Sequence, residues 1–185
     1  MIGGARFLQG GRGLCAALAF TLAVGTAAPG FAEGMAADKF KPGDKAPDFT
    51  LKSVAGGEVK LSSAAGKQVV LLNFWGLRCG ACLEEMPYLD KIWKTYKDKG
   101  LVVLGVDTDG VGVEDVVATL KEVEVSVSYP LLIDPDFAVT DVYTNFLVPL
   151  TLVIDKAGLV QYIHTGFEKG TEKHYEDAVK KALGL

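Results

Sequence analysis

Apolar and polar positions alternate along the chain in a way that predicts interleaved strands and helices. The segment 68–74 and the run Leu101–Val106 are apolar without alternation, as expected for strands buried on both faces of a sheet. Between them, residues 82–97 carry large apolar or sulfur side chains at spacings of four, three, four and three. That periodicity predicts a helix with one face against the sheet.

Shorter patterns predict two hairpins and further helices. Alternation in 46–51 and 58–61, around a Gly-Gly turn, predicts an N-terminal β-hairpin, and the runs 150–155 and 159–164 predict a second one. The other predicted elements are a helical turn (62–66), a strand (129–134) and three helices (113–123, 137–143, 171–183). This order predicts an α/β fold with a mixed central sheet flanked by helices, without a repeat or a second domain.

The length and charge of the chain limit its function. Its 185 residues suffice for one domain with a hydrophobic core. The formal net charge of −4 gives no basis for binding to nucleic acid or to anionic lipid. Nucleic acid is therefore not expected as a partner.

The N-terminus has the pattern of a secretory signal. Arg6 and Arg12 precede the eleven-residue apolar core Leu14–Val24, and Gly30 and Ala32 suit a signal peptidase. A membrane-spanning helix needs about 20 residues. We therefore predict a signal peptide (1–32), a flexible lead-in (33–45) and a domain (46–185) in the periplasm or another extracytoplasmic space. The alternative is an uncleaved N-terminal anchor, because residues 13–28 are nearly free of polar side chains.

Cys79 and Cys82 are the strongest chemical signal. Cys15 lies in the apolar core of the signal, so these two are the only cysteines of the mature chain. A disulfide between them closes too short a loop to add much stability, which indicates that the pair reacts. Unpartnered N–H groups and the positive end of the helix dipole favour a thiolate at a helix start. We predict Cys79 as the nucleophile and Cys82 as the resolving thiol.

Metal binding is a weaker alternative. Two Cys-x-x-Cys pairs would indicate structural zinc, but the chain has one pair and only His164 and His174, both distant in sequence. We therefore expect no metal and no cofactor. A copper-binding assembly factor would need the two cysteines and a histidine, and that class prefers a wider cysteine spacing.

The segment Asn73–Pro87 has the pattern Asn-Phe-Trp-Gly-x-x-Cys-x-x-Cys-x-x-Glu-Met-Pro, and Pro149 precedes the second hairpin. From about Pro47 to the C-terminus the chain closely resembles exported bacterial thioredoxin-like thiol–disulfide oxidoreductases of the TlpA/ResA type, in the redoxin superfamily. The resemblance implies a thioredoxin fold with an N-terminal β-hairpin and a central insertion at 109–129.

The same resemblance implies a protein disulfide oxidoreductase. Its role would be that of a reductase in cytochrome c maturation or similar extracytoplasmic thiol reduction. The implied partners are disulfide-bearing proteins, such as apocytochrome c or its maturation factors, and a membrane thiol electron donor.

The resemblance also assigns residues around the cysteines. Pro149 matches a cis-proline that faces the disulfide and holds substrate backbone, and Val148 before it shapes access to Cys79. Glu85, one turn after Cys82, matches a glutamate that perturbs cysteine pKa values and can exchange a proton with the resolving thiol. The alternative for Glu85 is a surface glutamate near a helix start. Trp75 is expected to shield the disulfide, to contact substrate or to complete the core.

The sequence departs from the family at three positions. Arg78 replaces the usual Trp before the first cysteine and should favour the thiolate, unless it points into solvent. Ala81 replaces the usual Pro, which leaves the reduction potential and the direction of electron flow open. Leu150 replaces the Thr that usually follows the cis-proline.

A peroxiredoxin-like peroxidase is the alternative enzyme, because it shares the fold and the position near Cys79. Such enzymes need a Pro and a Thr or Ser in the turn before the reactive cysteine, where this chain has Gly76–Arg78. Asp107, Asp109 and Glu114 follow a strand or begin a helix, where carboxylates are routine, and they receive no role from the sequence.

Overall fold

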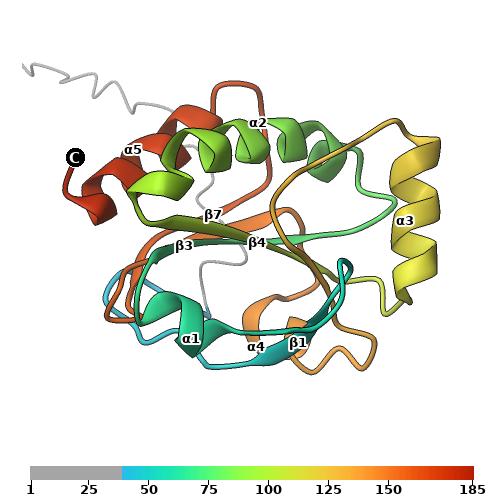
Figure 1. The fold of residues 1–185 in the computed structure, drawn as a ribbon, viewed down its shortest axis with the longest axis horizontal. Helices are drawn as coiled ribbons and strands as arrows, with labels where there is room; N and C mark the ends of the chain where they lie inside the picture. The colour runs from blue at the N-terminus through green and yellow to red at the C-terminus, as the bar shows by residue number, and fades with distance from the viewer. Residues whose placement is uncertain (1–38) are drawn as a thin grey trace, which may run out of the picture. The chain divides into compact units, whose positions relative to one another are not determined.

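The computed structural model describes residues 39–185, so the predicted signal peptide (1–32) and residues 33–38 lie outside the described part. Seven strands form one mixed sheet in the order β2-β1-β5-β4-β3-β6-β7 (Figure 1). The β3–β4 and β4–β5 pairs are parallel and the others antiparallel. The strands are β1 (Thr50–Ser53), β2 (Glu58–Lys60), β3 (Val69–Trp75), β4 (Leu101–Asp107), β5 (Leu131–Ile133), β6 (Leu150–Ile154) and β7 (Val160–Thr165).

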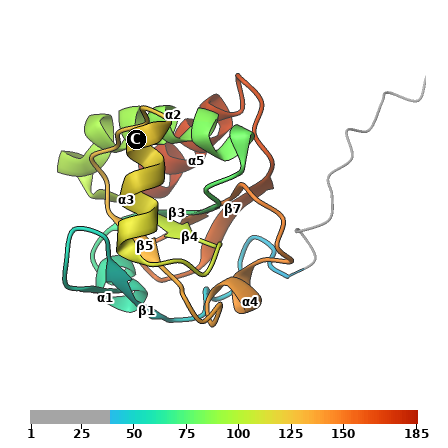
Figure 2. The same cartoon turned by 90° about the vertical axis from the view of Figure 1, so that its right-hand side faces the viewer.

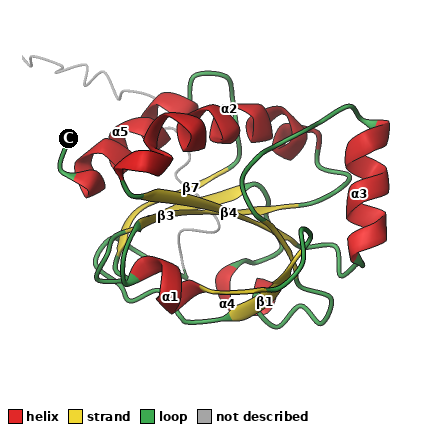
Figure 3. Cartoon of the chain, in the orientation of Figure 1, coloured by secondary structure: helices red, strands yellow, loops and turns green. Residues whose placement is uncertain are grey.

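Helices cover both faces of this sheet. The helices are α1 (Leu61–Ala65), α2 (Gly80–Tyr96), the 3-10 turn η1 (Lys97–Lys99), α3 (Val113–Glu122), α4 (Thr140–Tyr143) and α5 (Glu172–Leu183). One core cluster lies beneath α2 and α5, and a second lies between the sheet and α1 and α4 (Figures 1 and 3). Helix α3 connects β4 to β5 at the side of the sheet (Figure 2).

Strand β3 lies near the centre of the sheet, and all seven of its residues are buried. It pairs in parallel with β4 over seven positions, from Val69 opposite Leu101 to Trp75 opposite Asp107. Carboxyl ends of parallel strands meet at one edge, so the turns that follow β3 and β4 lie side by side. This edge carries the cysteines.

The predicted fold class is confirmed, including the N-terminal hairpin, the mixed sheet and the insertion that holds α3. The predicted start of the first strand is wrong. Strand β1 begins at Thr50 because Ala46 and Phe49 pack into the core, while the Ala46 N–H donates to the Gly158 carbonyl at 3.0 Å. The start of that segment therefore lies beside the turn of the second hairpin, and only at Phe49, whose carbonyl accepts from the Leu61 N–H at 3.0 Å, does it meet the residue after β2.

The predicted flexible lead-in is also wrong for residues 39–45. The Phe40 ring packs on Tyr143 with ring centroids 5.2 Å apart. The Gly43 N–H donates to the Val160 carbonyl at 2.8 Å, and Lys45 forms an antiparallel bridge with Leu159. The polar composition of residues 39–45 gave no sign of these backbone hydrogen bonds, because residues of any type can form them.

Gly105 of β4 permits close packing beneath α2. A methyl group there would approach Leu131 Cδ2 to 2.9 Å and Tyr129 Cε2 to 3.1 Å. Overpacking of this kind costs roughly 1–3 kcal/mol, so we expect Gly105→Ala to lower the free energy of unfolding by about 2 kcal/mol in urea denaturation. Gly80→Ala is the matched control, because its methyl would meet no heavy atom within 4 Å. Equal effects of the two substitutions would contradict this packing argument.

Candidate active site

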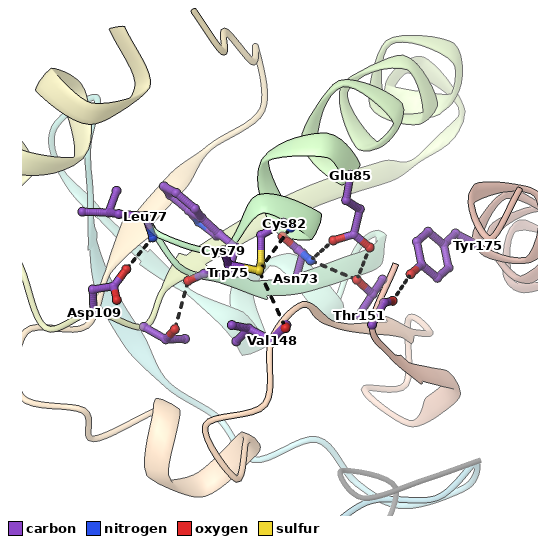
Figure 4. The surroundings of a disulfide bond; sticks show 12 residues. Asn73, Trp75, Leu77, Cys79, Cys82, Glu85, Asp109, Val148, Thr151 and Tyr175 are labelled. Carbon is purple, nitrogen blue, oxygen red and sulfur yellow. Dashed lines mark hydrogen bonds between the residues drawn. A yellow bond between two sulfur atoms is a disulfide. The ribbon is translucent and has the colours of Figure 1, made fainter. Parts of the chain in front are cut away.

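The two cysteines form a disulfide at the start of α2, directly after the turn that leaves β3 (Figure 4). Cys79 is the N-cap residue of α2 and is half-buried, whereas Cys82 is completely buried. The helix therefore begins one residue after Cys79. Only the Cys79 sulfur is placed to meet the sulfur of another protein.

The N-terminus of α2 supplies polar contacts to Cys79. The Cys82 N–H donates to Cys79 Sγ at 3.1 Å, as an N-cap side chain accepts from the third helical residue. A thiolate at this position would be stabilised by that hydrogen bond and by the helix dipole. Arg78, next in the turn, is exposed and adds a positive charge to this surface.

The loop before β6 faces the disulfide. The Val148–Pro149 peptide bond is cis, which confirms the predicted geometry. Val148 is half-buried, and its carbonyl oxygen lies 3.7 Å from Cys79 Sγ (Figure 4). In the disulfide this sulfur carries no hydrogen, so the contact becomes a hydrogen bond only when Cys79 is a thiol. Pro149 is buried, and its carbonyl accepts from the Gly166 N–H at 2.7 Å.

Glu85 points from α2 toward Asn73 and Thr151 (Figure 4) and is completely buried, which rules out the surface alternative. Asn73 Nδ2 donates to one carboxylate oxygen at 2.9 Å, and Thr151 Oγ1 donates to the other at 3.0 Å. Asn73 Nδ2 also donates to Thr151 Oγ1 at 2.9 Å. The carboxylate is thus held by β3 and β6.

Burial raises the pKa of Glu85 from its ordinary 4.5 to about 7. Hydrogen bonding from three neighbouring side chains, Tyr175, Thr151 and Asn73, opposes this rise without cancelling it. The carboxyl group therefore gains or loses a proton near neutral pH. The sequence analysis gave no role to Asn73 or Thr151. Thr151 could have been noticed as the one polar side chain in an otherwise apolar, buried strand.

A second set of contacts reaches the turn from the end of β4. Thr108 donates to the Trp75 carbonyl through its N–H at 2.9 Å and its hydroxyl at 3.0 Å. The carboxylate of Asp109 accepts from the Leu77 N–H (Figure 4). These residues after β4 had received no role from the sequence.

Trp75 has none of its surface exposed and belongs to the core cluster beneath α2. It therefore offers no surface to a partner protein in the disulfide-bonded form, contrary to the expected substrate contact. Within residues 39–185, no three His, Cys, Asp or Glu side chains are grouped as ligands for a metal ion. In the same range, no helix has the length and apolar character needed to cross a membrane.

The fold and the site define a thioredoxin-fold protein with a Cys-x-x-Cys disulfide at the start of a helix. A family model described as the AhpC/TSA family matches residues 42–163. The chain belongs to this family.

Curated relatives and solved structures agree with this assignment. Thiol-disulfide oxidoreductase ResA of Geobacillus kaustophilus is 36% identical over 137 residues, covering 72% of this chain and 76% of that protein. Thioredoxin-like protein YneN of Bacillus subtilis is 38% identical over 124 residues, covering 67% and 71%. A candidate thiol:disulfide interchange protein DsbE from Chlorobium tepidum is similar in structure, with TM-score 0.71 and 33% identity over 78% of this chain and 99% of that one.

Proposed function

We propose that this chain is an exported thiol–disulfide oxidoreductase that reduces disulfides in other proteins. The observation that carries the proposal is the Cys79–Cys82 disulfide at the tip of α2, with one sulfur accessible and the other buried. The relatives named thiol-disulfide oxidoreductase support the same class of reaction.

The reaction runs in two exchange steps. In the reduced protein, the Cys79 thiolate attacks one sulfur of a partner's disulfide, and the partner's other sulfur leaves as a thiolate. Cys82 then loses its proton and attacks Cys79 Sγ in the mixed disulfide. This step re-forms the Cys79–Cys82 bond and releases the partner's second sulfur as a thiolate. Two electrons have passed to the partner, and a thiol donor must reduce the protein again.

Glu85 serves the second step in this proposal. It lies three residues after Cys82 on α2, and its pKa of about 7 lets it accept a proton near neutral pH. Its hydrogen bonds go to Asn73 and Thr151. The carboxylate therefore acts on the resolving thiol from its fixed position in this network.

The partner meets the protein at the exposed side of the turn. The Val148 carbonyl faces Cys79, the cis bond to the buried Pro149 sets the path of the loop that holds the partner's backbone, and Arg78 favours the attacking thiolate. With residues 1–32 as a signal peptide and residues 46–185 as the domain, the site operates outside the cytoplasm. We expect apocytochrome c or one of its maturation factors as substrate and a membrane thiol protein as electron donor, because an oxidising compartment returns the pair to the disulfide.

Reduction of insulin tests this function directly. The fully reduced protein should cleave insulin disulfides and become oxidised in a one-to-one reaction, measured by loss of its two thiols. The same protein with hydrogen peroxide tests the peroxidase alternative. Faster oxidation by peroxide than by any protein disulfide would overturn the proposal.

A further inference from the structure

The turn that carries Cys79 is held by residues that follow β4. Thr108 donates two hydrogen bonds to the Trp75 carbonyl, and the Asp109 carboxylate accepts one from the Leu77 N–H. Two of the three hydrogen bonds come from Thr108 and end on one backbone carbonyl. The third uses a carboxylate, which is the only charged group among these contacts.

Asp109 lies against the backbone of the turn. A methyl group on Gly76 would approach its Oδ2 atom to 3.1 Å. Asp109 is nevertheless exposed, so water could satisfy the Leu77 N–H in its absence. The carboxylate is therefore not needed to avoid a buried unpaired donor.

A second carboxylate lies beside the first. The Asp109 N–H donates to Asp107 Oδ2 at 3.3 Å, and Asp107 is buried. Burial and, secondly, the charge of Asp109 raise the pKa of Asp107 to about 7. Asp109 thus places negative charge close to the start of α2.

This charge opposes ionisation of the nearby thiol. The Cα atoms of Leu77 and Cys79 are separated by at most about 7 Å, the reach of two residues. That length is comparable to the Debye length of about 8 Å at physiological ionic strength. Salt therefore does not fully screen the charge of Asp109, which is hydrogen-bonded to Leu77, and a nearby negative charge disfavours a thiolate. It acts against Arg78 and the dipole of α2.

We propose that Asp109 is a positioning residue that holds the Cys79 turn through the Leu77 N–H and whose charge disfavours the Cys79 thiolate. A less stable thiolate makes the reduced form less stable relative to the disulfide, which makes the protein a stronger reductant. The inference rests on the proposed function for its meaning, and it assigns the tuning of thiol acidity to a residue 30 positions after the cysteine.

Two substitutions separate the position from the charge. Asp109→Asn keeps an oxygen that accepts from the Leu77 N–H but removes the charge, whereas Asp109→Ala removes both. Titration of the reduced proteins by thiolate absorbance should show three- to tenfold more Cys79 thiolate in both variants at a pH below the thiol pKa, which corresponds to a thiol pKa lower by about half to one pH unit. In a glutathione redox buffer above that pKa, the reduction potential should rise by about 15 to 30 mV.

The rate of attack on a small disulfide reports the position of the turn. At a pH where Cys79 is fully ionised, Asp109→Asn should react like the parent protein, and Asp109→Ala should be slower by about threefold or more, because a misplaced sulfur attacks less often. Asp98→Asn is the matched control. Asp98 is exposed in η1, at the other end of α2 and about 28 Å from Cys79 by the rise of the helix.

The charge of Asp109, its effect on the turn and the disulfide reduction are measured separately. A thiol pKa and potential in Asp109→Asn no different from those of Asp98→Asn would overturn the role of the charge. Equal rates for the Asn and Ala variants at high pH would overturn the role in positioning. If the parent protein reduced no protein disulfide while the thiol pKa still shifted, the proposed function would fail and the assignment of Asp109 would stand.

Discussion

Cys79→Ala is expected to abolish disulfide reduction, with a loss of about a thousandfold or more relative to the parent protein. The other sulfur, Cys82, is completely buried and cannot reach a disulfide in another protein. Loss of a nucleophile leaves little of a reaction that depends on it. Insulin reduction, corrected for the rate with the chemical reductant alone, measures this loss.

Cys82→Ala is expected to give the opposite outcome. Cys79 keeps its place at the N-cap of α2 and still attacks, but no second thiol resolves the product. Mixed disulfides at Cys79 should therefore accumulate, visible on non-reducing gels and identified by mass spectrometry. The double variant Cys79→Ala/Cys82→Ala is the control and should trap nothing. If Cys79→Ala trapped more partner than Cys82→Ala, the two roles would be reversed.

Glu85→Gln is expected to change how stability depends on pH. Because burial raises the pKa of Glu85 from 4.5 to about 7, the folded protein holds this proton more tightly than the unfolded chain does. The resulting stabilisation is fully present below about pH 4.5 and is lost as the pH rises through about 7. The difference between 4.5 and about 7 corresponds to roughly 3 kcal/mol. The Gln variant should lack this loss.

Urea denaturation of the oxidised protein between pH 4.5 and pH 8 measures this effect without titration of the thiols. The buried Asp107 adds a slope of the same sign to both proteins, so the difference between them isolates Glu85. Glu84→Gln is the matched control, since Glu84 is exposed on the same turn of α2. Parallel stability curves for the parent and the Gln variant would show that Glu85 is already ionised well below neutral pH.

At neutral pH, the buried carboxylate of Glu85 is expected to lower the free energy of unfolding, and this cost is relevant to its function. A buried carboxylate lowers stability above its pKa, and an apolar side chain in its place would not. Natural proteins retain such costs chiefly at functional sites. The Asn73 and Thr151 hydrogen bonds reduce the cost while they hold the carboxylate between α2, β3 and β6. Loss of resolution in Glu85→Gln, seen as a longer-lived mixed disulfide, would connect the two observations.

Local sequence patterns sufficed for most of the elements, though not for the start of β1 or the ordered segment 39–45, and for the cysteine pair. The uninterrupted apolar run of β3 and the helical spacing of α2 can be seen within each segment, because the geometry of a strand or helix sets which of its residues face the core. The cysteines lie between these two elements, so their place at a helix start followed from the sequence alone. The match to the family pattern added the cis bond before Pro149, which the structure confirms.

The surroundings of the pair were decided by the tertiary structure. Thr151 reaches Glu85 across 66 positions of sequence, and Asp109 reaches Leu77 across 32. Periodicity reports whether a position is buried, but the parallel register of β3 and β4 and the antiparallel register of β3 and β6 determine which side chains meet there. The sequence by itself therefore determined the fold class and the two reactive sulfurs. Only strand pairing decided which carboxylates lie near them, because it brings together residues that no local pattern relates.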